Sequence, residues 1–149
     1  MVQIVIKGAE DLERLGKALK QVGDRELRLE LLRAIRTATK PTHQQIRASA
    51  RELLPHRGGL ADLIARCSLS TRTRLSGRSV GVRVQARSQH DIRALDKGRL
   101  RHPLYGDREH WFQQYVREGW FSRPLFATGK AVRLEVSEAA SRIALKFLK

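Results

Sequence analysis

The aromatic residues of this chain are concentrated in one irregular segment, Arg99 to Phe121. Six of the eight Phe, Trp and Tyr residues lie there, namely Tyr105, Trp111, Phe112, Tyr115, Trp120 and Phe121. Aromatic side chains dominate the energetics of cores and interfaces because each buries a large area. Pro103, Gly106 and Gly119 interrupt the segment, so it cannot form one continuous helix. We therefore expect a long ordered loop at about residues 88–121, held by its own rings and ending in a short strand.

Length and composition predict a single structural domain over residues 1–149, with a lean core because 41% of the residues are hydrophobic. No apolar run approaches the roughly 18 residues of a membrane span, so no membrane contact is expected. The N-terminus lacks a basic start followed by an apolar stretch, so no secretory signal is predicted. The single Cys67 cannot form an intramolecular disulfide, which fits folding in the cytoplasm with a buried, inert thiol.

The net charge of +15 is the strongest anomaly of the composition. One interpretation is an acidic partner, either nucleic acid or an acidic protein surface. The other is a biased genome, because 22 of the 30 basic residues are arginine and the charge is spread along the chain. No run of five or more Lys or Arg residues forms a basic tail. The composition leaves both interpretations open.

The first residues alternate like a strand, with Val2, Ile4 and Ile6 on one side. Apolar residues then recur at helical spacing from Leu12 to Val22, and Gly23 is a typical residue to end that helix.

A second, longer helix begins after Asp24, which is a good N-cap residue. Its apolar stripe extends from Leu27 to Leu53, and its outer face is rich in arginine. Pro41 removes one backbone hydrogen bond in the middle of this helix, so we expect a kink or break near Lys40.

The clearest strand pattern lies in the middle of the chain. Apolar and polar residues alternate from Cys67 to Leu75 and again from Val80 to Arg87, and Ser76–Arg78 supplies a turn. The expected hairpin has one apolar face, covered by the two long helices, and one arginine-rich face. We predict that this second face contacts an acidic partner or DNA through Arg72, Arg74, Arg83 and Arg87.

Three further elements complete the expected fold: one helical turn at Ile92–Asp96, a last short strand at Trp111–Val116, and a C-terminal helix capped by Ser122. The predicted class is α+β. A small antiparallel sheet, made of the N-terminal strand, the arginine-rich hairpin and the late strand, packs against a long kinked N-terminal helix and a C-terminal helix.

The sequence gives only weak evidence for a metal or catalytic site in the aromatic segment. Imidazoles and carboxylates are close in sequence there and could bind a metal ion or activate water in a basic nuclease: His102, Asp107, Glu109 and His110, with His90 and Asp91 upstream. Their spacing matches no metal motif, since there is no His-Glu-x-x-His and no pair of cysteines. No Ser, Cys or Lys has the setting of a nucleophile. We expect no enzyme, no cofactor, no metal and no catalytic residue.

The rings have two alternative roles. Aromatic rings can stack on bases while arginines contact phosphates. Here, however, the pairs Trp111–Phe112 and Trp120–Phe121 are flanked by glycine and acidic residues. This arrangement is more typical of rings that anchor a loop or dock on a neighbour.

The motif Arg101-His102-Pro103-Leu104-Tyr105-Gly106, followed by Trp111, then Gly119-Trp120-Phe121 and Pro124, resembles the small tail-component proteins of tailed bacteriophages. These are called neck or tail-completion proteins. The opening of the chain, with a strand, a glycine, a leucine-bearing helix and a long basic helix, is similar in kind.

The resemblance implies a non-enzymatic subunit of the virion neck, assembled in the host cytoplasm. It also implies a homo-oligomeric ring, a hexamer or dodecamer, that joins the head connector to the tail around the DNA channel. Its partners would be head-closure, tail-terminator or tail-tube proteins, with nonspecific contact to packaged DNA. The alternative is a basic nucleic-acid-binding protein, including a metal-dependent nuclease. The residues predicted to anchor the loop or the interface are Arg101, His102, Pro103, Tyr105, Gly106, Trp111, Phe112, Trp120 and Phe121.

Overall fold

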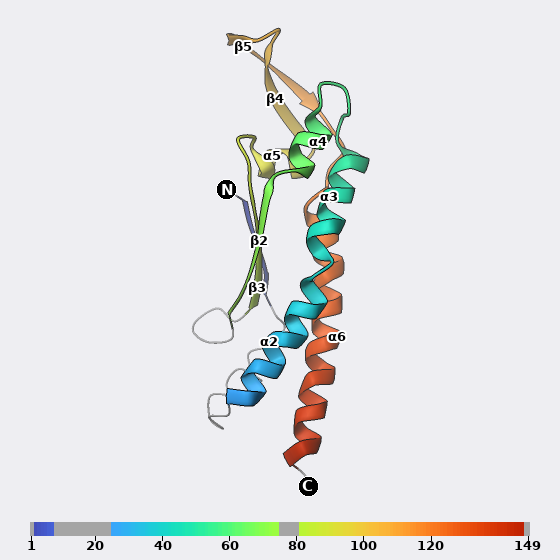
Figure 1. Ribbon diagram of the computed structural model, residues 1–149. Coiled ribbons are helices and arrows are strands. Elements are labelled where there is room, and N and C mark those ends of the chain that lie inside the picture. The colour runs from blue at the N-terminus through green and yellow to red at the C-terminus, as the bar shows by residue number, and fades with distance from the viewer. Residues whose placement is uncertain (1, 8–24, 75–80, 148–149) are drawn as a thin grey trace.

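Long helices lie on one side of a small antiparallel sheet in the computed structural model of this chain (Figure 1). The structure describes residues 2–7, 25–74 and 81–147. The helix predicted through Leu12–Val22 and the turn predicted at Ser76–Arg78 lie outside these residues. The α+β class, with its bent N-terminal helix and its C-terminal helix, is confirmed.

The sheet contains the strands β1 (Val2–Lys7), β2 (Ser68–Arg74) and β3 (Gly81–Arg87) in the order β1-β3-β2. Both pairings are antiparallel, so the predicted hairpin and N-terminal strand are confirmed. Alternate residues of β3, Val82 and Val84, are buried beneath the helices. The period of two in the sequence therefore marks the core face of the sheet correctly.

The long helix is divided into α2 (Arg25–Thr39) and α3 (Thr42–Leu53), as Pro41 predicts. Lys40 still donates its backbone N–H to Arg36 O at 3.0 Å. Proline has no N–H to continue the ladder, and the helix resumes one residue later. The bend is visible between α2 and α3 in Figure 1.

The C-terminal helix α6 (Ser122–Phe147) packs along both α2 and α3. A buried pair of hydroxyls joins α3 to α6, with Thr42 Oγ1 and Thr128 Oγ1 2.9 Å apart. Thr128 donates to Pro124 O at 2.9 Å, so the hydroxyl of Thr42 is the donor between the two threonines. The packing therefore satisfies both buried hydroxyls.

Two groups of buried side chains form the core. The first gathers α3, the short helix α4 (Leu60–Ala65), the sheet and the start of α6, and its largest members are Trp120 and Phe121. The second joins α2 to the middle of α6 through Leu31, Ile35 and Val132. Cys67 belongs to the first group, where burial raises the pKa of its thiol.

The region from residue 88 to 121 differs from the expected loop. It contains a short helix, α5 (Ile92–Asp96), as predicted, and then the strands β4 (Arg99–Leu104) and β5 (Asp107–Tyr115). The late strand begins earlier than expected and pairs with β4 in a separate two-stranded sheet, not with the main sheet. No helix in the described part of the chain is both long and apolar enough to span a bilayer.

Candidate functional site

The strands β4 and β5 and the turn between them form a ribbon that extends beyond the helices, and we call residues 99–115 the arm (Figure 1). All nine residues of β5 are exposed. The main sheet buries one of its faces under helices, whereas the arm places its strand β5 in solvent throughout. The arm is therefore left uncovered along β5, whereas Leu100 of β4 packs against the core at its base.

The turn at the end of the arm has unusual backbone geometry. Tyr105 and Gly106 both have positive φ angles, 50° and 84°. Positive φ at both central residues is typical of a type I′ turn, whose twist matches that of the two strands of a tight hairpin. Glycine adopts this conformation without strain, but tyrosine does so rarely. Tyr105 is also 99% exposed.

The strand register places different rings on the two faces of the arm. Pro103 is paired with Trp111, and His102 is paired with Phe112, so the two rings point to opposite faces. On one face, the Arg101 guanidinium lies 5.1 Å from the centre of the Trp111 ring, a cation–π contact. On the other, the rings of His102 and Phe112 meet edge to face, 5.9 Å apart. Trp111 and Phe112 nevertheless remain 50% and 53% exposed.

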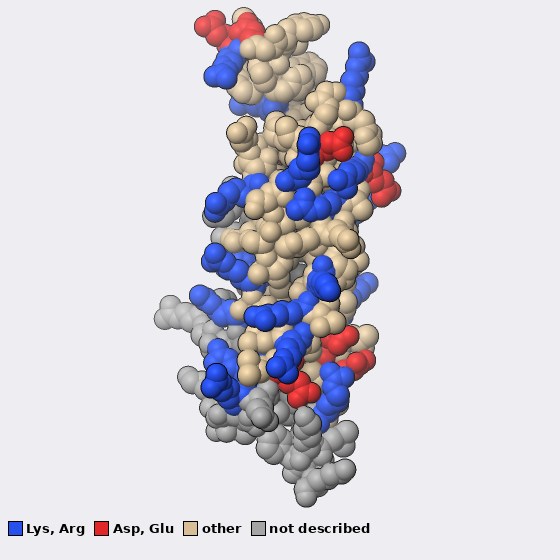
Figure 2. All heavy atoms as spheres, in the orientation of Figure 1, with Lys and Arg blue, Asp and Glu red and all other residues tan. Residues whose placement is uncertain are grey.

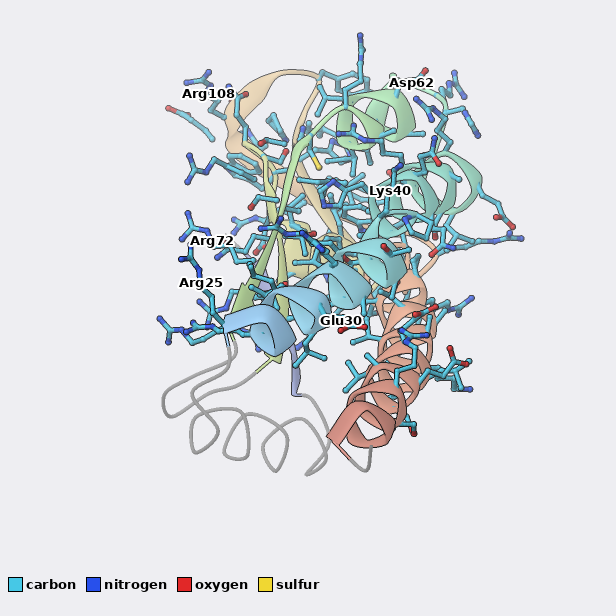
Figure 3. All side chains as sticks on the ribbon, turned by 60° about the horizontal axis from the view of Figure 1, so that its bottom comes forward. Arg25, Glu30, Lys40, Asp62, Arg72 and Arg108 are labelled. Atoms are coloured by element: carbon cyan, nitrogen blue, oxygen red, sulfur yellow. The ribbon has the colours of Figure 1, made fainter. Side chains whose placement is uncertain are left out.

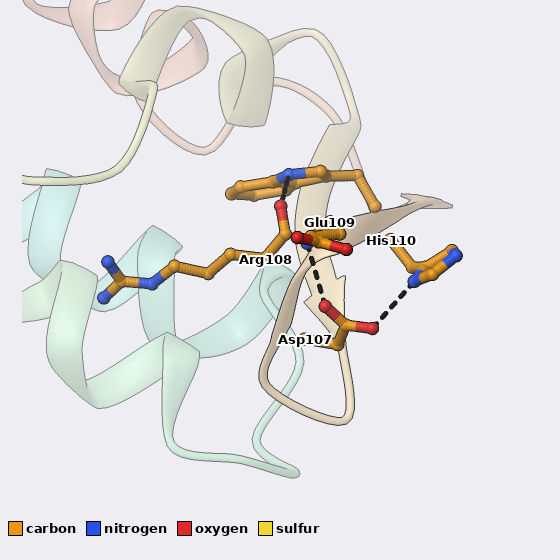
Figure 4. A network of polar contacts seen from close by, with 5 residues as sticks. Asp107, Arg108, Glu109 and His110 are labelled. Atoms are coloured by element: carbon orange, nitrogen blue, oxygen red, sulfur yellow. Dashed lines mark hydrogen bonds and ion pairs between the residues drawn. The ribbon is translucent and has the colours of Figure 1, made fainter.

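A network of hydrogen bonds shapes the end of the arm (Figure 4). Asp107 Oδ1 accepts the backbone N–H of Glu109 at 2.9 Å, and Asp107 Oδ2 lies 2.7 Å from His110 Nδ1. These two hydrogen bonds, first that of Glu109 and then that of His110, lower the pKa of the Asp107 carboxyl. The indole of Trp111 donates to Arg108 O at 2.8 Å. The network orders the residues that follow the turn, where the strand register shifts.

Short segments on either side of the arm attach its base to the body of the protein. Gly98 has a φ of 75°, and a Cβ there would come within 2.7 Å of Val116 O. The backbone of Val116 donates to Gly98 O, and Gly119 donates to Asp96 O at 2.8 Å. These contacts require glycine at position 98, because a side chain would separate the two ends of the arm.

Asp96, the last residue of α5, connects this helix to the start of α6. Its Oδ1 accepts the backbone N–H groups of Phe121 and Ser122 at 2.8 and 3.0 Å. Phe121 directly precedes α6 and Ser122 is its first residue, so both N–H groups lie at the positive end of the helix, where the backbone N–H groups lack a partner inside it. The carboxylate of Asp96 therefore serves as a cap from another element, while Ser122, the predicted cap, is already part of the helix.

The structure separates the nine predicted anchor residues into two groups. Trp120 and Phe121 are fully buried in the protomer, with their ring centres 5.5 Å apart. They hold the base of the arm to the core and do not reach a neighbour. The remaining seven lie in the arm: Arg101, His102, Pro103, Tyr105, Gly106, Trp111 and Phe112. His102 and Pro103 are half-buried there, whereas Tyr115, also in the arm, is 80% exposed.

A hollow of about 680 Å³ lies between α5 and the base of the arm. Its charged lining is mainly basic: Arg93, Lys97, Arg99 and Arg101, with His90 and Asp91 at one end. The Asp91 carboxylate already accepts the backbone N–H groups of Arg93 and Ala94, both at 3.0 Å. The hollow is thus a concave basic surface beside a convex aromatic arm.

The structure does not bring the predicted imidazoles and carboxylates into one cluster. Within residues 2–7, 25–74 and 81–147, no group of three or more His, Cys, Asp or Glu side chains is placed to hold a metal ion. Asp107 and His110 bind each other at the end of the arm. His102 contacts Phe112 instead, and its Nδ1 lies 3.1 Å from Pro103 O.

The predicted arginine face of the main sheet exists. Arg72 of β2 is paired directly with Arg83 of β3, and Ser68 is paired with Arg87, so these side chains share one face. Arg74 follows two residues after Arg72 on that face. Val82 and Val84 of β3 point to the opposite face and are buried in the core, so this surface is on the side of the sheet away from the core.

Comparison of the chain with protein-family models, with curated proteins and with solved structures finds no match. The site is therefore interpreted from its own geometry. Sequence reasoning missed Asp96, whose partner lies 25 residues further on, and Gly98. The only local signal was a glycine two residues after a predicted helical turn, which is a common place for a positive φ.

Proposed function

We propose that this chain is a structural subunit of a bacteriophage head–tail connection, a neck or tail-completion ring that joins the head connector to the tail around the DNA channel. The observation that carries the proposal is the arm. It presents four exposed rings, Tyr105, Trp111, Phe112 and Tyr115, on a ribbon that the protomer leaves uncovered. The assignment to phage rests on the sequence resemblance of the same segment.

The arm has the physical properties of an element that is completed by a neighbour. A two-stranded hairpin alone is only marginally stable in water, and each strand has an unpaired edge. Large exposed rings are typical of binding surfaces, and Trp, Tyr and Arg dominate binding hot spots. Burying these rings against another protein would stabilise the arm and the contact together.

The neighbour in this proposal is another copy of the chain. A ring is built from contacts in which one patch meets a different patch of the next subunit. The exposed rings at the end of the arm and the basic hollow between α5 and β4 are two such different patches, although the hollow also includes residues from the base of the arm. Closure by rotation then gives a homo-oligomer, proposed as a hexamer or dodecamer. Head-closure, tail-terminator or tail-tube proteins would contact the ring above and below.

The proposal gives the arm no catalytic role. Both oxygens of Asp107 accept hydrogen bonds from within the arm, from Glu109 and His110. Trp111 and His102 contact side chains of the opposite strand. In this proposal these groups shape a surface that binds another protein. The contact forms in the virion, which is assembled in the host cytoplasm.

Two observations test the proposal. Light scattering and negative-stain images of the purified protein should show rings of one size, and mass spectrometry of purified phage particles should detect the chain. A protein that is monomeric at every concentration and absent from particles would contradict the proposal.

A further inference from the structure

The face of the main sheet that points away from the helices carries only polar and basic side chains from β2 and β3. We call it the arginine face, and it consists of Ser68, Ser70, Arg72, Arg74, Arg83, Gln85 and Arg87. The alternate residues of β3, Val82 and Val84, are buried on the opposite face. The sheet therefore has one face for the core and one face for solvent or a ligand.

The charge on this face is unbalanced. Neither β2 nor β3 contains an Asp or Glu. Arg72 lies directly opposite Arg83, and like charges in such a pair destabilise a sheet. Within the part of the chain that the structure describes, none of the four arginines forms an ion pair. A ligand with several negative charges would relieve this repulsion.

The composition of the face favours phosphate over an acidic protein. The centre of a protein–protein interface is depleted in charged residues and enriched in aromatic ones. The part of the arginine face that β2 and β3 form has the opposite character, since these two strands give it no apolar side chain; the register places Val5 of β1 beside Arg83. Interfaces with nucleic acid are polar and strongly basic. The guanidinium group also matches phosphate geometry with two parallel hydrogen bonds.

The arrangement suits a chain of phosphates. Arg72 and Arg74 lie two residues apart on β2, which separates their backbone positions by about 6.7 Å. The arginines of β3 form a second row on the neighbouring strand, about 4.8 Å away. Several guanidinium groups can thus meet successive charges along one nucleic-acid strand. Basic side chains also continue beyond the sheet, and Figure 3 shows Arg25 of α2 on the same side of the molecule as Arg72. The space-filling view shows Lys and Arg side chains along the left edge of the molecule and across the surface that faces the viewer (Figure 2).

We propose that the arginine face binds the phosphodiester backbone of nucleic acid without reading its sequence. The ligand class is double-stranded or single-stranded nucleic acid, recognised through charge and guanidinium–phosphate hydrogen bonds. The proposal concerns a different surface from the arm. It stands if the protein never forms a ring, and it fails independently of the ring.

The test is a salt titration of binding to a fluorescently labelled 30-base-pair duplex of mixed sequence, measured by anisotropy. Two double variants lose the same charge: Arg72→Ser with Arg83→Ser on the face, and Arg133→Ser with Arg142→Ser on α6. Each phosphate contact contributes about 0.9 to the slope of log affinity against log salt. We expect the face variant to lower the slope by about 2 and to weaken binding roughly tenfold or more at low salt. The α6 variant should keep the wild-type slope.

Three results would overturn the proposal: equal loss of binding in both variants, no binding of the wild type to the duplex, or binding to polyglutamate alone. The last would assign the face to an acidic protein. The face variant should remain folded, because removing Arg72 and Arg83 also removes their repulsion, and its urea midpoint checks this. The titration is repeated in the Trp111→Ser, Phe112→Ser background. The same slope difference there supports the arginine face whether or not the arm joins copies.

Discussion

The carboxylate of Asp96 accepts the backbone N–H of Phe121 at 2.8 Å, although 25 residues separate them. The contact joins the end of α5 to the start of α6 across the whole arm. Phe121 itself is fully buried in the core. One carboxylate therefore joins the segment before the arm to the segment after it, next to the buried ring of Phe121.

Replacement of Asp96 tests this attachment. The variant Asp96→Ala should lower the free energy of unfolding by about 1–2 kcal/mol, because it removes the cap of α6. Asp96→Asn keeps an oxygen acceptor and should lose only the charge interaction with the helix end, about 0.3–1 kcal/mol. Urea unfolding measures both variants. Equal losses in Asp96→Ala and Asp96→Asn would show that the hydrogen bonds of Oδ1 do not matter.

Two phenylalanines of the same segment should behave in opposite ways. Phe121→Ala removes a fully buried ring and should cost about 3–5 kcal/mol of unfolding free energy. Phe112→Ala removes a half-exposed ring of the arm and should change the stability of the monomer by less than about 0.5 kcal/mol. Urea unfolding of the two variants side by side is the measurement. A large loss in Phe112→Ala would mean that its ring belongs to the core.

Tyr105 should reduce the stability of the arm through its positive φ while its ring contributes to the contact between copies. Asparagine tolerates the positive φ of 50° better than tyrosine, so Tyr105→Asn should stabilise the arm by up to about 1 kcal/mol. Hydrogen exchange of the arm amides should slow accordingly, while assembly weakens because the ring is gone.

Tyr105→Ala is the matched control, since it removes the same ring but keeps the strained backbone. It should weaken assembly as much as Tyr105→Asn without slowing exchange. Exchange that slows equally in both variants would show that the strain at this position is negligible.

His43 gives the protein a specific dependence on pH. Its Nε2 lies 2.9 Å from Thr71 Oγ1, and burial, with a smaller contribution from Arg47, lowers its pKa below the ordinary 6.5. Between the lowered pKa and 6.5, the unfolded chain binds more protons than the folded chain. The free energy of unfolding should therefore fall as pH decreases through 6.5 and should be fully regained above it.

His43→Gln should remove this part of the pH dependence. Urea midpoints of both proteins from pH 5 to pH 8 measure it, and the difference between the two curves isolates His43 from the other histidines. Parallel curves over that range would contradict the lowered pKa.

The features of the fold that could be predicted from the sequence are those that depend on neighbouring residues. Pro41 divides the long helix because of its missing N–H, and the alternation around Arg72 and Arg83 places both on one face. Each effect acts within a few residues, so it can be read from the chain. The same holds for the short helix at Ile92–Asp96.

The arm was not predictable in the same way. Its turn requires positive φ at two adjacent residues, which Asn-Gly would signal, whereas this chain has Tyr105-Gly106. Trp111–Phe112 and Trp120–Phe121 are similar pairs in sequence, yet only the second is buried. The second pair packs in the core and lies next to the contact with Asp96, and both involve residues far apart in the chain.

Sedimentation velocity of the wild type and of the Trp111→Ser, Phe112→Ser variant, over a series of concentrations, tests the central claim that the arm joins copies of the chain. We expect the wild type to form one large species whose size stops increasing with concentration, as a closed ring requires. We expect the variant to sediment as a folded monomer. A wild type that is monomeric throughout, or a variant that assembles as fully as the wild type, would contradict the account.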